Sequence, residues 1–173
     1  MYGNDREVAA ALEYFFRTSG KSRDSLFITS KAWQSYDDLE AGCRKMLSRL
    51  GCEYFDLYLL HGPTIANPPS GTGKTNLQLW KEMENLLNLN LVRKIGLSNF
   101  RASDIREIME GNPKVKPVIN QVEFHPYLQQ PVLREVCRGY GIGMAAYKAL
   151  APLTKCRGGP LDGLLPAMAK RHG

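Results

Sequence analysis

The sequence lacks the long apolar run that a membrane-spanning helix requires, which is about 20 residues in a typical bilayer. Its four cysteines include no C-x-x-C pair, and their spacing forms no regular disulfide framework. We therefore expect reduced structural thiols in a cytoplasmic protein that has no metal site and no membrane partner. The cysteines are Cys43, Cys52, Cys137 and Cys156.

Concentrated positive charge is also absent, although 23 Lys and Arg residues outnumber 17 Asp and Glu residues and give a formal net charge of +6. This excess suits an anionic ligand such as a phosphorylated cofactor, and it also suits nucleic acid. The basic residues are scattered, without a Lys/Arg block or an aromatic RNA-binding signature, so we expect a solvated basic surface and no nucleic-acid partner. The segment "GTGKT" (71–75) lacks the first glycine of a P-loop because Pro68 occupies that position, and we interpret it as a polar loop.

Short apolar runs alternate with amphipathic stretches along the chain. Each run has the length and the Val, Ile, Leu and aromatic content of a buried strand. The predicted strands are 25–31, 54–61, 92–99, 117–124 and 142–150. Apolar residues recur at helical spacing within 8–16, 39–50, 77–87, 105–109, 133–140 and 164–168. A helix followed by five strand–helix units predicts parallel strands joined by right-handed crossovers, in one α/β domain over residues 1–173. The Pro- and Gly-rich connection at 62–76 is long for such a domain, which is typical of a functional loop.

Polar residues end all five predicted strands. They are Lys31; His61; Ser98 and Asn99; Gln121, Glu123 and His125; and Tyr147 with Lys148. One such residue alone is most simply a strand end that meets solvent, but the carboxyl ends of parallel strands converge, so five together predict one shared site. A lysine and a histidine beside a phenol suit acid catalysis on a carbonyl, because an ammonium within about 4–6 Å lowers the pKa of a phenol by about 1–3 units.

Six motifs in this chain resemble, in order and spacing, the aldo-keto reductases. They are "YGNDREV", "LFITSKAW", "DLYLLHGP", "KIGLSNF", "NQVEFHPYLQQ" and "AYKALAPL". The resemblance runs from Met1 to Gly173 and is nearest to fungal-type members that reduce ketones and aldehydes. It implies a (β/α)8 TIM barrel, the cofactor NADPH and a small-molecule carbonyl substrate.

The resemblance also implies a role for each matching residue. Tyr2 is the expected general acid, Lys31 the group that lowers its pKa, and His61 the residue that orients the substrate. Ser98, Asn99 and Gln121 match positions that bind the nicotinamide carboxamide, and Tyr147 matches the aromatic residue that stacks on the nicotinamide ring. The expected reaction is hydride transfer from NADPH to a carbonyl carbon, with Tyr2 protonating the oxygen.

Compared with the family pattern, the chain is expected to be an incomplete barrel. The resemblance implies that two strands before Tyr2, and one strand and helix after Gly173, have no counterpart, so that Tyr2 follows a strand–loop unit that is absent. The family's aspartate that pairs with the lysine and its basic segment for the 2′-phosphate are among the unmatched parts. Inside the matched part, Lys148 replaces a small hydroxyl residue and Gly62 replaces a tryptophan of many members.

Two functions follow from this pattern. The first is NADPH-dependent carbonyl reduction with Tyr2 as proton donor. The alternative is a catalytically silent fragment that acts only as a binding or dimerising partner. An open five-stranded sheet has two unpaired edges, so self-association through these edges is a further expectation.

Overall fold

The computed structural model describes residues 3–33, 35–64 and 73–173, and these residues contain one five-stranded sheet with its strands in sequence order. The strands are β1 (Thr29–Ala32), β2 (Leu57–Leu60), β3 (Ile95–Ser98), β4 (Ile119–Glu123) and β5 (Gly143–Tyr147). All neighbouring strands pair in parallel. The structure therefore confirms the prediction of five parallel strands that alternate with helices.

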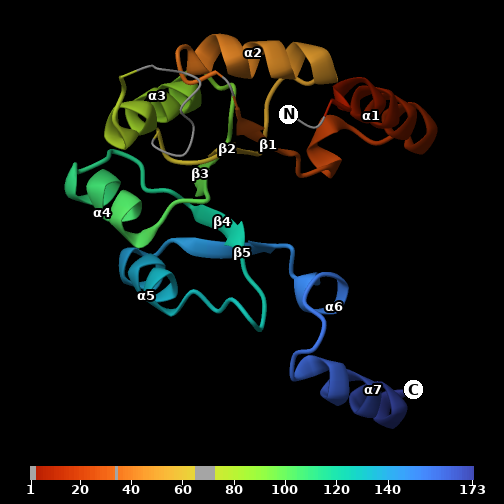
Figure 1. Cartoon of the computed structure of the whole chain (residues 1–173). Coiled ribbons are helices and arrows are strands. Elements are labelled where there is room, and N and C mark those ends of the chain that lie inside the picture. Colours follow the sequence, from red (N-terminus) through yellow and green to blue (C-terminus); the bar gives the residue numbers. More distant parts are fainter. Residues whose placement is uncertain (1–2, 34, 65–72) are drawn as a thin grey trace.

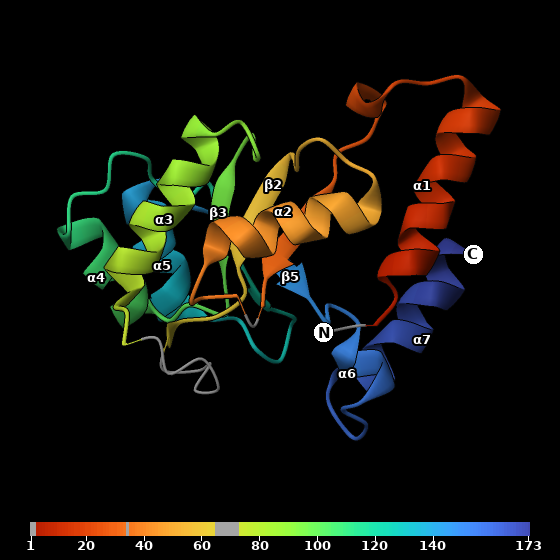
Figure 2. The same ribbon diagram turned by 90° about the horizontal axis from the view of Figure 1, so that it is seen from above.

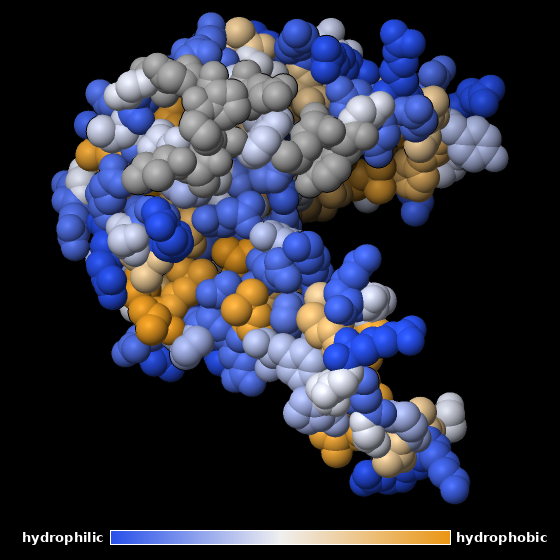
Figure 3. Space-filling view, in the orientation of Figure 1, coloured by the Kyte–Doolittle hydropathy of each residue, from blue (hydrophilic) through white to orange (hydrophobic). Residues whose placement is uncertain are grey.

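The helices lie on the outer side of an arc whose inner side is the sheet (Figure 1). They are α1 (Asp5–Ser19), α2 (Leu39–Leu50), α3 (Asn76–Asn88), α4 (Ala102–Glu110), α5 (Pro131–Tyr140), α6 (Ala151–Thr154) and α7 (Leu161–His172), with a 3-10 turn η1 (Arg23–Ser25). Helix α1 packs beside α2, and α6 and α7 follow β5 at the other end of the arc (Figure 1). Seen from above, α1, α6 and α7 lie on the same side of the molecule, away from α3, α4 and α5 (Figure 2). The arc is open on one side, between the part with α1 and the part with α6 and α7 (Figure 3). No helix among the described residues is long and apolar enough to cross a membrane.

The two faces of the sheet differ because successive side chains of a strand point to opposite sides. On the outer face, buried residues such as Tyr58, Leu60, Ile95 and Leu97 join one apolar core with the helices. That core also receives Leu39, Cys43 and Leu47 from α2; Leu79, Trp80, Met83 and Leu86 from α3; Ile105 and Ile108 from α4; and Leu133, Val136 and Cys137 from α5. The burial of this outer face leaves the alternate residues of each strand to form the inner face.

Gly96 in β3 shows how closely the inner face is filled. A Cβ atom at this position would lie 2.7 Å from Cδ2 of Leu59 in β2 and 2.9 Å from the carbonyl oxygen of Ile119 in β4. These distances are too short for a side chain at position 96. Because glycine has none, β3 can lie this close to β2 and β4. This packing fixes the relative position of the three strands whose ends carry His61, Ser98 and Gln121.

The first predicted strand begins later than expected, at Thr29, because the preceding residues take another conformation. Arg23–Ser25 form the 3-10 turn η1. The Asp56 carboxylate then accepts hydrogen bonds from the backbone N–H of Ile28 and from the Arg23 guanidinium, both at 2.7 Å. The Asp56 side chain therefore supports the entry to β1, in addition to the backbone hydrogen bond from the N–H of Asp56 to the carbonyl oxygen of Ile28 at 3.0 Å.

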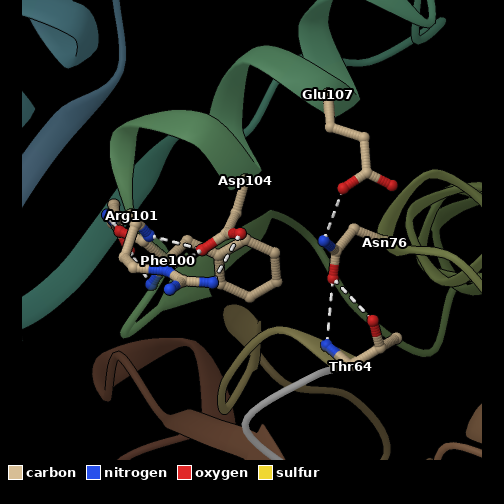
Figure 4. Close-up of polar contacts among 7 residues, drawn as sticks. Thr64, Asn76, Phe100, Arg101, Asp104 and Glu107 are labelled. Carbon is tan, nitrogen blue, oxygen red and sulfur yellow. Dashed lines mark hydrogen bonds and ion pairs between the residues drawn. The ribbon is translucent and has the colours of Figure 1, made fainter.

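A buried asparagine joins the segment after β2 to two helices (Figure 4). Asn76 is 2% exposed, and its Oδ1 accepts hydrogen bonds from the N–H of Thr64 at 3.0 Å and from the Thr64 hydroxyl at 3.4 Å. Its Nδ2 donates to Oε2 of Glu107 in α4 at 2.7 Å. In the same view Asp104 caps the start of α4 by accepting from the N–H of Arg101 at 2.8 Å. Asn76 thus links the residues that follow the strand carrying His61 to α3 and α4.

We expect Asn76→Ala to lower the free energy of unfolding by about 1–3 kcal/mol, because buried partners lose hydrogen bonds of which one involves a charged group. Asn85→Ala is the matched control: Asn85 lies in the same helix but is exposed, so its replacement should change stability by less than about 0.5 kcal/mol. Urea unfolding followed by circular dichroism measures both. Equal effects of the two substitutions would contradict the role assigned to Asn76.

Candidate active site

The parallel register brings polar side chains of all five strands to one rim of the inner face. Lys31 of β1 pairs in register with Leu59 of β2, and Ser98 of β3 pairs with Gln121 of β4. Tyr147 ends β5 on the same face, since it pairs with Glu123 two residues beyond Gln121. The arc curves enough that Nζ of Lys31 lies 5.9 Å from the centroid of the Tyr147 ring. The first and last strands of the sheet therefore contribute to one site.

Asn99 connects three of the strand ends. Its Nδ2 donates to the carbonyl oxygen of His61 at 2.8 Å and lies 3.3 Å from the Ser98 hydroxyl. Its Oδ1 accepts a hydrogen bond of 2.5 Å from the Tyr147 hydroxyl. Strand alternation alone would direct Asn99 to the outer face. A left-handed backbone with φ of 60°, which asparagine adopts more readily than most residues, instead allows its side chain to reach the site.

Gln121 and Ser98 lie beside Asn99, on the inner face of the sheet. The Ser98 hydroxyl donates to the carbonyl oxygen of Gln121 at 2.9 Å. Within the described residues, the side-chain amide of Gln121 has no hydrogen-bond partner, so both its donor and its acceptor are available to a ligand. Of the three residues predicted to bind a carboxamide, Gln121 is open to one, whereas Ser98 and Asn99 are engaged by the protein.

Lys31 and His61 are the two residues of the rim whose pKa values are lowered by burial. Burial lowers the pKa of the Lys31 ammonium below its ordinary value. Burial, together with the charge of Lys31, lowers the pKa of His61 to about 4. His61 is therefore neutral near pH 7 and can offer a ring N–H without carrying a charge.

Two aromatic residues that the sequence did not single out complete the surroundings of His61. The ring centroid of Trp33 lies 4.6 Å from that of His61. The Tyr36 hydroxyl donates to the carbonyl oxygen of Gly62 at 2.6 Å and lies 3.1 Å from its N–H. Trp33 stands two residues after Lys31, and this spacing was the available signal that it lies on the same side of the chain.

A cavity of about 540 Å³ opens beside these residues. It lies at the β1 edge of the sheet: Lys31, Trp33 and His61 contribute to its lining, and so do Ser30 and Tyr58 of the outer face and residues of α1 and α2. Tyr2, the predicted proton donor, lies outside the described residues. No group of His, Cys, Asp or Glu side chains that could hold a metal ion is found in the described ranges.

Glu123 and Lys148 form an ion pair at the β4 and β5 end of the rim. Nζ of Lys148 lies 2.9 Å from Oε2 of Glu123, and Oε1 of Glu123 lies 3.4 Å from Nε2 of His125. The hydrogen bond from Lys148 lowers the pKa of Glu123, and the same bond raises the pKa of Lys148. Both groups therefore remain charged near neutral pH.

The lowered pKa of His61 makes folding stability depend on pH. The ordinary histidine pKa is about 6.5 and that of folded His61 is about 4, so between these values the unfolded chain binds more protons. The free energy of unfolding should therefore fall as the pH is lowered from about 6.5 to about 4, with a contribution from this group of at most about 1.4 kcal/mol per pH unit. Urea unfolding at a series of pH values should show a shallower dependence for His61→Gln. His172 is exposed near the end of the chain, so His172→Gln should leave the pH dependence of the free energy of unfolding unchanged. The same pH dependence in the wild type and in His61→Gln would refute the lowered pKa assigned to His61.

The chain is similar in sequence and in structure to known proteins of one family. The model of the aldo/keto reductase family matches residues 1–156. Aldose reductase B of Dictyostelium discoideum is 38% identical over 170 residues, which cover 87% of this chain and 54% of that protein. The aldose reductase of Schistosoma japonicum superimposes with a TM-score of 0.79 at 30% identity, covering 98% of this chain and 60% of the other. A Bombyx mori aldo-keto reductase in complex with NADP gives a TM-score of 0.76 at 31% identity, covering 85% and 49%.

The chain spans about half the length of the curated relatives it matches. The structural matches are aldo-keto reductase barrels, of which this chain covers 49% and 60%. The family match extends over most of the chain and includes every strand whose end contributes to the rim. The chain therefore belongs to the aldo/keto reductase family.

Proposed function

We propose that this chain carries the carbonyl-reducing site of an NADPH-dependent aldo-keto reductase, which converts an aldehyde or ketone to an alcohol. The observation that supports this most is the meeting of Lys31, His61 and Tyr147 at one rim of the inner face, next to a cavity. A lysine, a neutral imidazole and an aromatic face suit this chemistry, together with a proton donor, for which we propose Tyr2. The family match and the NADP complex of a similar structure support the same reaction.

The residues of the rim fit the nicotinamide end of NADPH. Gln121 offers an unpartnered amide, which can form a pair of complementary hydrogen bonds with a carboxamide, and Tyr147 offers a partly buried ring for a flat heterocycle. Ser98 and Asn99 hold the surrounding strand ends, and the side-chain oxygen of Asn99 becomes available to a ligand if the Tyr147 hydroxyl leaves it. When bound, NADPH supplies the hydride that reaches the carbonyl carbon.

The chemistry at the carbonyl oxygen falls to three residues. His61, being neutral near pH 7, donates a ring N–H to that oxygen and orients it. Tyr2 is the proposed proton donor, and the Lys31 ammonium lowers the pKa of its phenol. Because Lys31 is itself partly buried, its charge acts in a medium of low dielectric and is felt strongly over a short range.

A second candidate is the catalytically silent binding partner. Within the described ranges no carboxylate lies within ion-pair distance of Lys31, whereas the family pattern pairs this lysine with an aspartate. Without an acidic partner the lysine is held less firmly toward a phenol. Such a chain can retain nicotinamide binding through Gln121 and Tyr147 while turning over slowly or not at all.

Binding of NADPH tests the cofactor assignment. We expect Tyr147→Ala to weaken binding by about two- to twelvefold, because an aromatic contact contributes about 0.5–1.5 kcal/mol beyond its buried area. Titration followed by NADPH fluorescence measures the dissociation constant. Tyr14→Ala removes an exposed tyrosine on α1 and should leave binding unchanged. Binding that is indifferent to Tyr147 would place the nicotinamide elsewhere.

Turnover separates the two candidate functions. If the chain is a reductase, Lys31→Met should lower kcat by about 100-fold, since general acid catalysis supplies about 10²–10⁴ of the rate, and Tyr2→Phe should lower it at least as much. Absorbance at 340 nm with a panel of aldehydes and ketones follows the reaction, and Lys81→Met on the exposed side of α3 is the control. Binding of NADPH that depends on Tyr147, without turnover of any substrate, would favour the silent partner instead.

A further inference from the structure

Lys74, from the segment "GTGKT", contacts three acceptors of the protein itself. Its Nζ donates to the carbonyl oxygens of Tyr36 at 2.9 Å and of Asp37 at 2.8 Å. It also lies 2.7 Å from Oε1 of Glu82 in α3. An ammonium has three N–H donors, so these acceptors match its capacity. The hydroxyl of the next residue, Thr75, caps the start of α3. The two side chains that would hold a phosphate in a P-loop therefore hold parts of this chain together.

The contacts of Lys74 join two connections that follow neighbouring strands. Tyr36 and Asp37 belong to the connection from β1 to α2, whereas Lys74 belongs to the connection from β2 to α3. The side chain of Tyr36 makes a second link in the opposite direction, because its hydroxyl donates to the carbonyl oxygen of Gly62 at 2.6 Å. Tyr36 is 1% exposed and the Lys74 side chain 24%, so both links are largely shielded from water. The two connections are therefore fixed to each other at two points.

The connection from β1 to α2 also carries Trp33. This residue follows β1 directly, three residues before Tyr36, and its ring centroid lies 4.6 Å from that of His61. Trp33 and His61 both line the cavity at the β1 edge. Between Trp33 and Tyr36, Ser35 packs so closely on α2 that a Cβ atom at Gly42 would lie 2.3 Å from the Cβ of Ser35. Helices α2 and α3 thus both hold the connection that brings Trp33 to the cavity.

We propose that Lys74 is a positioning residue, which fixes the connection from β1 to α2 and thereby keeps the Trp33 ring against His61. A charged donor suits this role because charge-assisted hydrogen bonds are stronger than neutral ones and hold a more definite geometry. An uncharged, apolar side chain at position 74 removes the donor from two backbone carbonyl oxygens and separates the connection from Glu82. The inference rests on the proposed function only where it concerns turnover: there, Lys74 sets the affinity for the carbonyl substrate through Trp33.

Fluorine NMR of the chain labelled with 5-fluorotryptophan tests the position of Trp33 directly, because the sequence has only two tryptophans. The other one, Trp80, is 0% exposed in the core and serves as an internal control. We expect Lys74→Met to move the Trp33 resonance toward that of the free amino acid and to leave the Trp80 resonance in place. Lys74→Arg should keep the wild-type spectrum, since a guanidinium can donate to the same three acceptors. Lys81→Met, on the exposed side of α3, should change neither resonance.

Two results of this experiment would overturn the proposal. One is a Trp33 resonance that is the same in Lys74→Met as in the wild type. The other is a shift of both tryptophan resonances, which would mean that Lys74 supports the fold as a whole and not Trp33 in particular.

Turnover measures the consequence for function. We expect Lys74→Met to raise KM by about two- to twelvefold, the fold-change that one aromatic contact accounts for. The value of kcat should change by less than about twofold, because a contact with the body of the substrate acts alike on the ground state and the transition state. In a Trp33→Ala background, Lys74→Met should raise KM no further, since residues that act through one contact are not additive.

The outcomes separate this proposal from the function on which its second arm rests. Additive effects of Lys74→Met and Trp33→Ala on KM would overturn the route through Trp33 and leave the proposed reductase standing. If the wild-type chain reduces none of the aldehydes and ketones, the proposed function fails, and the NMR comparison still decides whether Lys74 positions Trp33.

Discussion

Burial of the outer face of the sheet against helices α2 to α5 is the constraint on which the site depends. Once residues such as Tyr58, Leu60 and Leu97 are committed to that core, the alternation of side chains sends Lys31, Ser98 and Gln121 to the inner face. A slip of one residue in any strand would bury these polar groups among apolar side chains, at a cost that the fold could not offset. The apolar core thus sets the arrangement of the site, although it shares no atom with it.

Much of this arrangement could be predicted from the sequence, because it follows from periodicity and strand direction. Five apolar runs, each ending in a polar residue, were enough to predict parallel strands and a common rim. What could not be predicted depends on backbone geometry between the elements. The left-handed conformations of Asn99 and Lys148, and the turn η1 before β1, have no signal in hydrophobic periodicity, yet they decide where two of the side chains at the rim lie. Tyr2 stays a prediction, since it falls outside the described residues.

The contacts of Asn99 change how its role in ligand binding should be understood. The family pattern assigns Asn99 to a carboxamide, but in this structure its amide binds the His61 carbonyl and the Tyr147 hydroxyl. A ligand that uses Asn99 must therefore exchange one hydrogen bond for another, and the net gain is smaller than for a group that starts without a protein partner. Gln121 has no such competitor among the described residues, so in the proposed nicotinamide site we expect it to contribute more to the affinity for a carboxamide than Asn99.

The charge of Lys31 at the rim bears on what the proposed site is suited to bind. A partly buried ammonium is unfavourable unless an opposite charge lies close to it, and Lys31 has no such partner among the described residues. The neighbouring His61 stays neutral near pH 7, because burial lowers its pKa and the positive charge of Lys31 lowers that pKa further. In the proposed reductase, an ionised phenol, a phosphate or the oxygen of a carbonyl that is being reduced would each bring negative charge close to Lys31. If the chain reduces carbonyls as proposed, the charge of Lys31 would stabilise the reacting state more than the resting one, which is the physical requirement for catalysis.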